Sequence, residues 1–158
     1  MPALRPADRA FLDEAPLRLV ESVDIRADRS TTWTALCDQQ GWVDWFPGLR
    51  LVVADPDVWT APGDTRTVRI GRLVVREEAI AVESETEWGF TILSWPLPGF
   101  RRGAESVRLA DGPDGGTTVT YVGAFEVDLL GRLLWPLLRG RIASSWTTAF
   151  ASLDDLIA

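Results

Sequence analysis

The second half of the chain alternates strand-like segments with short turns, and this pattern constrains the fold more than any other feature. Segments rich in branched and aromatic residues follow one another at 49–55, 65–70, 72–84, 87–95, 104–111 and 117–127. The residues between them are mostly Gly, Pro, Asp and other turn formers. Strands joined by short turns pair with their neighbours in the antiparallel direction. We therefore expect an antiparallel meander.

Helical patterns flank this series of strands. A strand at 17–25 leads into a helix that Asp28 or Ser30 can cap, and a second, shorter helix should follow it. From residue 129 to the end, apolar residues recur mostly at three- and four-residue steps. This spacing predicts a long amphipathic helix that opens or bends near Pro136.

The connection between the short helices and the first strand of the meander is unusually aromatic. Trp42, Trp45 and Phe46 lie within five positions, and each large aromatic side chain buries roughly 150–250 Å² when it is packed. A solvated connection should avoid such residues, so other elements must cover this segment. We expect these three side chains to wedge the short helices against the sheet and the long helix, either as packing alone or also as walls of a ligand cavity.

The order of elements, together with several short motifs, resembles the START-related lipid-transfer and polyketide cyclase/dehydrase superfamily (SRPBCC). The motifs are Ala27 and Trp33 after the first strand, then GWVDWFPG, APGDTRTVRI, REEAI, PDGGTTVTYV and the Leu-rich last helix, so the resemblance covers residues 17–158. It implies an α+β helix-grip fold, in which a curved seven-stranded antiparallel sheet wraps a long C-terminal helix above a cavity, with two short helices after the first strand. Residues 1–16 are expected to form a flexible lead-in to this single domain.

Composition excludes several classes of function. The sixteen basic residues, all Arg, are scattered among twenty-three acidic ones and leave a net charge of −7, so no nucleic-acid surface is expected. No apolar run approaches the roughly 20 residues of a membrane span. The first residues lack the apolar core of a signal peptide, which favours a cytoplasmic protein. With no His and only Cys37, neither a usual metal cluster nor a His-activated nucleophile is available, and no metal or cofactor is expected.

Alternation along the strands, in the register that the resemblance implies, defines the inner face of the sheet. That face is mainly apolar with a few separated polar groups, as is typical of a site for a hydrophobic small molecule. A filled core is the alternative, since a covered sheet always has an apolar inner face. The expected ligand-binding residues are Trp45, Phe46, Arg66, Val68, Arg76, Glu78, Ile80, Phe90, Ile92, Glu105, Val107, Tyr121 and Phe125, with Leu134, Leu138 and Trp146 from the last helix.

The charged members of this set leave the function open. An Arg66 or Arg76 pair with Glu78 or Glu105 is either a structural ion pair or a device that orients a ligand. Binding of a lipid- or polyketide-like molecule is the first interpretation. The second is a cyclase- or dehydratase-type enzyme, with Tyr121, Glu78 or Glu105 as acid and base and an arginine stabilising enolate charge. The third is a protein-interaction module, which would show an exposed apolar patch.

Tyr121 is the only tyrosine of the chain, and Gly123 beside it leaves space over the sheet. A buried phenol needs a hydrogen-bond partner. We expect its hydroxyl to point into the cavity, where a polar ligand atom or Glu105 on the adjoining strand could accept the bond.

Overall fold

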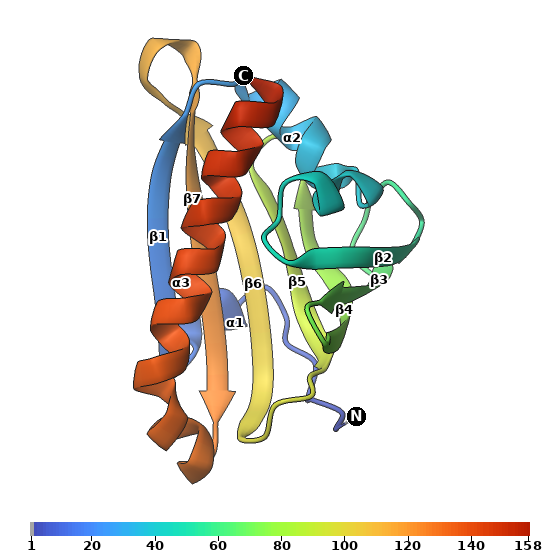
Figure 1. Ribbon diagram of the computed structural model, residues 1–158, viewed down its shortest axis with the longest axis vertical. Helices are drawn as coiled ribbons and strands as arrows, with labels where there is room; N and C mark the ends of the chain where they lie inside the picture. The colour runs from blue at the N-terminus through green and yellow to red at the C-terminus, as the bar shows by residue number, and fades with distance from the viewer. Residues whose placement is uncertain (1) are drawn as a thin grey trace.

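A computed structural model describes residues 2–158, and it contains one seven-stranded antiparallel sheet that curves around a long helix (Figure 1). The sheet order is β1-β7-β6-β5-β4-β3-β2, so that β2 to β7 form a meander and β1 pairs with β7. The predicted helix-grip arrangement is confirmed. The strands are β1 (Leu17–Ile25), β2 (Leu49–Asp55), β3 (Thr65–Ile70), β4 (Leu73–Glu83), β5 (Glu87–Ser94), β6 (Phe100–Asp111) and β7 (Thr117–Val127).

The helices begin at the caps that the sequence offers. Asp28 accepts a hydrogen bond from a backbone N–H in the first turn of its helix, and Asp128 does the same for the long helix. The helical conformation of the long helix continues through Pro136. Within residues 2–158, no helix is both long and apolar enough to cross a bilayer. The helices are α1 (Phe11–Glu14), α2 (Arg29–Cys37), α3 (Leu129–Ile157) and the 3₁₀ turns η1 (Gln40–Asp44) and η2 (Pro113–Gly115).

A two-residue turn sets the register between β3 and β4. Its first residue, Gly71, has φ +59°, and Ile70 pairs with Leu73 across the turn. A glycine at this position is typical of the tight hairpin turns whose twist matches that of the strands. Counting outward from the turn, Arg66 lies directly opposite Glu77. Both side chains therefore share the inner face.

This register corrects one part of the sequence analysis. Arg76, Glu78 and Ile80 point to the outer face of the sheet: Arg76 is exposed, and Ile80 packs against the outer cluster around Phe11. Their predicted place in the cavity is wrong, because one residue of shift in a strand moves every side chain to the other face.

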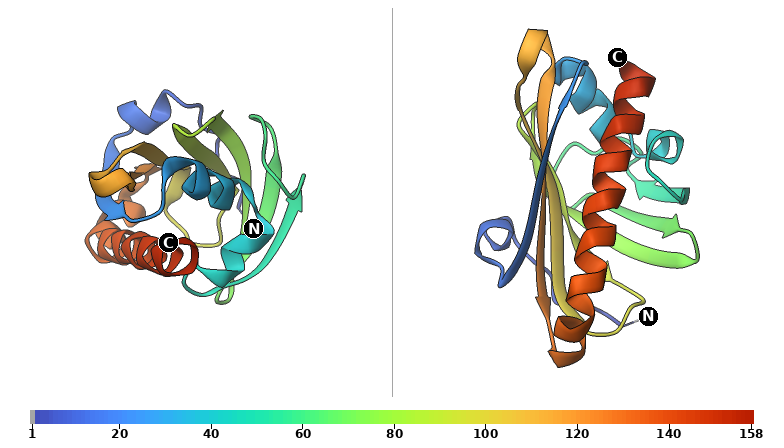
Figure 2. Two further views of the ribbon diagram at one scale, coloured as in Figure 1. Left: turned by 90° about the horizontal axis from the view of Figure 1, so that it is seen from above. Right: turned by 60° about the vertical axis from the view of Figure 1, so that its left-hand side comes forward.

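The segment before β1 lies against the outer face of the sheet, where Figure 2 shows it on the side opposite α3. Backbone hydrogen bonds of 3.0 Å join it to β5 and β6. Phe11 and Leu12 of α1 are buried against Ala104 and Ala124, whose small side chains make room for them. Residues 4–12 of the segment expected to be a flexible lead-in are thus packed, and they cover apolar surface that a bare sheet would expose.

Candidate functional site

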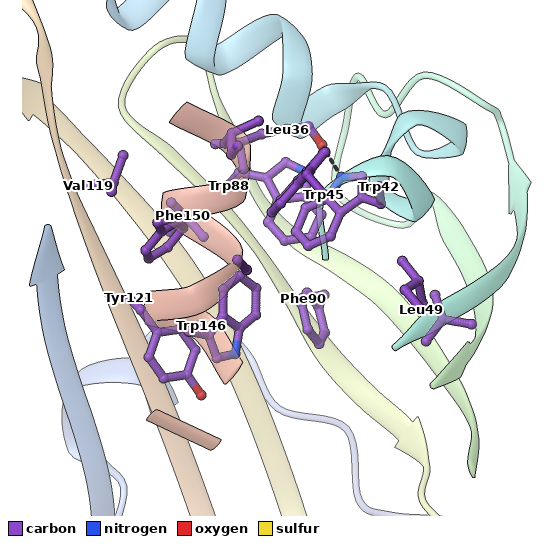
Figure 3. Close-up of a cluster of buried hydrophobic side chains, with 14 of the residues drawn as sticks. Leu36, Trp42, Trp45, Leu49, Trp88, Phe90, Val119, Tyr121, Trp146 and Phe150 are labelled. Atoms are coloured by element: carbon purple, nitrogen blue, oxygen red, sulfur yellow. Dashed lines mark hydrogen bonds between the residues drawn. The ribbon is translucent and has the colours of Figure 1, made fainter. Parts of the chain in front are cut away.

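The aromatic connection after α2 packs into the space between the sheet and α3 (Figure 3). The ring of Trp42 lies 4.2 Å from that of Trp45 and 4.7 Å from that of Trp88 on β5. Phe46 meets Trp146 of α3 edge-on at 5.0 Å. The Trp42 indole also donates a hydrogen bond of 3.0 Å to a backbone carbonyl of α2. These contacts explain why the connection is aromatic: its rings fill the interior where three elements meet.

Arg66 and Glu77 form a buried ion pair beneath this aromatic group. Arg66 Nε donates to Glu77 Oε2 at 2.5 Å, and Arg66 Nη1 donates to Gln39 Oε1 at 2.9 Å. The guanidinium lies 4.4 Å from the ring centroid of Trp42 and within 5.3 Å of three further aromatic rings. Burial raises the pKa of Glu77, and the charge of Arg66 opposes that rise. Two hydrogen bonds and the surrounding rings hold the arginine, an arrangement typical of a buried ion pair that stabilises the fold.

A cavity of about 140 Å³ remains between the sheet and α3. It is smaller than the roughly 300–1,000 Å³ usual for ligand pockets, because the tryptophan and phenylalanine side chains occupy most of the interior. Its walls are mainly aromatic and aliphatic, and two carboxylic acids contribute its charged groups. The lining residues are Phe46, Ile70, Leu73, Val75, Glu77, Trp95, Glu105, Ile142, Ser145 and Trp146.

Glu105 joins the cavity to the buried tyrosine. The Tyr121 hydroxyl donates to Glu105 Oε1 at 2.6 Å, and the tyrosine ring stacks on Trp146 at 4.7 Å (Figure 3). A Cβ atom at Gly123 would lie 2.3 Å from the tyrosine oxygen, so only glycine leaves space for this ring. Glu105 therefore separates Tyr121 from the cavity, and Tyr121 does not line it. The Tyr121 hydroxyl is hydrogen-bonded to the carboxyl group of Glu105 instead.

The environment of Glu105 places its titration near neutrality. Burial is the largest cause that raises its pKa, and the nearby charge of Glu77 adds to the rise, whereas the Tyr121 hydrogen bond opposes it; the resulting pKa is about 7. Burial and the charge of Glu105 raise the pKa of Tyr121 well above its usual value. Near pH 7 the carboxyl group can therefore gain or lose a proton while the phenol remains a hydrogen-bond donor.

The expected ligand-binding residues separate into distinct places. Phe46, Glu105 and Trp146 line the cavity. Arg66 is separated from the cavity by Glu77. Leu134 and Leu138 are half-buried on α3. Arg76, Glu78 and Ile80 of β4 face outward. The ligand-binding role of the whole set remains a prediction. The remaining members fill the core around the cavity: Trp45, Val68, Phe90, Ile92, Val107, Tyr121 and Phe125.

Seven cavity residues lay outside the expected set: Ile70, Leu73, Val75, Glu77, Trp95, Ile142 and Ser145. Val75 and Glu77 pair across the hairpin with Val68 and Arg66, so the two-residue turn at Gly71 was the signal that could have found them. Trp95 lies just past the end of β5, where strand alternation no longer places a side chain.

A second hollow, of about 420 Å³, lies at the surface between α2 and the segment that joins β2 to β3. Trp33, Cys37 and Trp59 contribute to its walls. Burial raises the pKa of the Cys37 thiol to about 11, which keeps it protonated and unreactive at neutral pH. The one carboxylate in the walls of this hollow, Asp38, is exposed, whereas Glu77 and Glu105 of the interior cavity are buried or half-buried, so we take the cavity between the sheet and α3 as the candidate site.

Comparisons with known proteins agree with this architecture. Solved structures with the same fold include a START superfamily protein from Mycobacterium smegmatis (TM-score 0.70, 11% identity, 89% of this chain and 96% of that one). Another is protein MLL2253 from Mesorhizobium loti, with a TM-score of 0.70 and 20% identity over 89% of this chain and 96% of that one. A protein from Thermobifida fusca has a TM-score of 0.70 and 17% identity over 87% of this chain and 90% of that one. At such identities the likeness shows the fold alone. A search of the curated proteins found no match.

The family assignment comes from the sequence itself. Residues 16–158 match the family described as polyketide cyclase / dehydrase and lipid transport. This match spans all seven strands and the long helix. The chain therefore belongs to the polyketide cyclase/dehydrase and lipid transport family, as the order of its elements and motifs predicted.

Proposed function

We propose that the protein binds a hydrophobic or aromatic small molecule in the cavity between the sheet and α3. The observation that carries the proposal is a space left open in an otherwise filled interior, with aromatic walls and the half-buried carboxyl group of Glu105 at its edge. An apolar pocket with a few convergent polar groups is the usual form of a small-molecule site. The family description, which names cyclase, dehydrase and lipid-transport roles, supports the same class of ligand.

The size of the cavity limits what enters it. An apolar protein cavity of about 150 Å³ accepts benzene, and the cavity here has about 140 Å³. One ring, or the end of a longer lipid- or polyketide-like molecule, fits this volume. The remainder of a longer ligand would leave past Ile142 and Trp95, which are only half-buried.

The two carboxyl groups of the cavity, Glu77 and Glu105, would have different roles in binding the ligand. Glu77 is neutralised by Arg66 and supports the wall. Within residues 2–158 Glu105 forms no ion pair, and it accepts a hydrogen bond from the Tyr121 hydroxyl, with the Trp146 indole also close enough to lower its pKa. A ligand with a hydroxyl or amine beside its apolar body would give Glu105 a further donor, which is worth about 0.5–1.5 kcal/mol for a neutral hydrogen bond.

An NMR titration tests the proposal with benzyl alcohol, which combines one ring with one hydroxyl. We expect saturable shifts of the indole signals of Trp95 and Trp146. Ile142→Trp, which fills the cavity, should abolish these shifts, whereas Leu156→Trp, at an exposed position of the same helix, should leave them intact. Equal shifts in both variants, or no saturation in the wild type, would disprove binding in the cavity.

Proton transfer at the same site is the second candidate function. It is favoured by one observation, the pKa of about 7 of a carboxyl group that reaches the cavity. A carboxylate with this pKa can remove a proton from a carbon next to a ketone and return it. Arg76 and Glu78, which face outward, take no part in this chemistry.

Exchange of the α-protons of phenylacetone in D₂O measures this activity directly. The wild type should accelerate exchange above buffer, and Glu105→Gln should return the rate to that of buffer. Equal rates in the wild type and the variant would leave binding as the function of the cavity.

A further inference from the structure

The first turns of α3 expose leucine where a surface helix is normally polar. Leu129, Leu133 and Leu137 are spaced by four residues, lie along one face, and are 75%, 72% and 58% exposed. Leu130 beside them is 46% exposed. None of these side chains belongs to the packed core.

Four of the five exposed leucines of α3 lie in its first three turns, and the fifth, Leu156, lies at the other end. Beyond residue 141, the exposed positions of α3 carry small or polar residues, such as Ser144, Thr148 and Ala151, until the last turns. The segment 129–141 is about 20 Å long at 1.5 Å per residue. We call the stripe of exposed leucines on this segment, formed by Leu129, Leu130, Leu133 and Leu137, the leucine face.

Arginines flank the leucine face on both sides. Arg132, Arg139 and Arg141 are all exposed, and within residues 2–158 none of them forms an ion pair. At about 100° per residue, Arg132 and Arg139 fall on one side of the leucines and Arg141 on the other. Residues 129–153 contain no Asp or Glu, although the chain carries a net charge of −7. Positive charge is therefore concentrated beside the apolar stripe.

The start of α3 lies beside the turn that leads to the cavity. Figures 1 and 2 show the start of α3 beside the turn between β5 and β6. Gly99 of that turn accepts a hydrogen bond of 2.9 Å from Asp128, and a Cβ at Gly99 would lie 2.6 Å from the backbone of Gly131. The same turn begins with Trp95, which lines the cavity together with Ile142 of α3. The leucine face itself lies on the opposite side of α3 from the cavity, because Ile142 is about 180° around the helix from Leu133.

We propose that the leucine face, on residues 129–141 of α3, docks the protein on an anionic lipid bilayer. A helix that lies in the membrane interface buries apolar side chains at the boundary of head groups and acyl chains, and its basic residues contact lipid phosphates. The leucines and flanking arginines supply both interactions. The proposal does not depend on what fills the cavity.

Charge argues against a second copy of the chain as the occupant. A twofold dimer brings the same patch of both copies together. The arginines of one copy would then meet those of the other, and the leucine face offers no carboxylate to pair with them. An anionic bilayer has the complementary charge.

Flotation with lipid vesicles tests the docking surface. The wild type should bind vesicles of phosphatidylcholine with about one third phosphatidylglycerol at least about tenfold more strongly than vesicles of pure phosphatidylcholine, because each arginine near an anionic surface raises the affinity about fivefold. Salt at 0.5 M should weaken this binding, because it screens the charges. The double variant Leu133→Gln, Leu137→Gln should lose most of the binding. The matched control Leu51→Gln, Val53→Gln removes two exposed apolar side chains of β2 and should bind as the wild type does.

A second pair of variants isolates the charge. Replacing Arg132, Arg139 and Arg141 by Gln should weaken binding by up to about a hundredfold at low salt. The control replaces three exposed arginines at positions 50, 69 and 72 by Gln and gives the same net charge, so its binding should stay within a few-fold of the wild type. All substituted positions are exposed, and circular dichroism should show unchanged folding.

Absence of wild-type binding to anionic vesicles would overturn the proposal, as would equal losses in the patch variants and their controls. Light scattering after size exclusion tests the competing occupant. A dimer that the leucine substitutions dissociate, without vesicle binding, would identify the leucine face as a protein interface instead.

Discussion

Replacing Arg66 by Met should destabilise the protein more than most single substitutions. The change removes the cation from Glu77, which stays buried, and the donor from Gln39 Oε1. It also removes a guanidinium that lies 4.4 Å from the ring centroid of Trp42. Loss of one partner of a buried ion pair costs about 3–5 kcal/mol, because the other charge remains without compensation. We expect Arg66→Met to lower the free energy of unfolding by this amount at pH 7.

The pH dependence of this loss of stability follows from the pKa of Glu77. Without the arginine, nothing opposes the rise that burial causes in the pKa of Glu77. The folded variant then holds a proton that the unfolded chain releases near its ordinary pKa of about 4.5. Its free energy of unfolding therefore falls as pH rises from about 4.5 through the raised pKa in the folded state. The deficit relative to the wild type should be smallest near pH 4.5 and largest above that raised pKa.

Urea unfolding followed by circular dichroism measures these differences, with Glu77→Met and the double variant completing a cycle. Replacing both partners by apolar residues is often close to neutral. The double variant should thus be more stable than Arg66→Met alone by at least about 2 kcal/mol. If the losses of the single variants add to within about 0.5 kcal/mol in the double variant, the two groups are not coupled and the structural ion pair is refuted.

Three further predictions concern the interior. The pKa of Glu105 in the folded state, about 7, lies above its ordinary value of 4.5, so the free energy of unfolding of the wild type should fall as pH rises from 4.5 to 7. Glu105→Gln should remove this fall. If the wild type and the variant lose stability in parallel over this range, the assignment to Glu105 is wrong. Gly123→Ala forces Tyr121 from its place and should cost about 1–3 kcal/mol, whereas Gly140→Ala, in open space on α3, should cost nothing in a thermal melt. Trp45→Ala should cost about 3–5 kcal/mol in urea unfolding, and a loss under about 1 kcal/mol would show that the aromatic connection is not part of the core.

Local patterns were sufficient to predict the order of the strands and of the helices that follow β1. Turn residues at short intervals gave the meander, and Asp28 was one of the two expected caps of α2. The register of β4 required one more step, because each strand was assigned its inner face separately. The two-residue turn at Gly71 couples the faces of β3 and β4, and this coupling places Glu77, not Glu78, opposite Arg66.

Other features depend on surfaces that exist only after the sheet has formed. The short α1 has no periodic pattern of its own, and it is held by the shallow surface that Ala104 and Ala124 leave on neighbouring strands. The cavity depends on side-chain packing in the same way. Tyr121 was expected to point into it, but the space above Gly123 and the stacked ring of Trp146 place it behind Glu105.

A crystal structure of the protein equilibrated with benzyl alcohol tests the central claim most directly. The account predicts a bound ring between the sheet and α3, in contact with Trp95 and Trp146, with its hydroxyl within hydrogen-bond distance of Glu105. A cavity that stays empty, or a ring found only in the surface hollow beside Trp33 and Trp59, would contradict it.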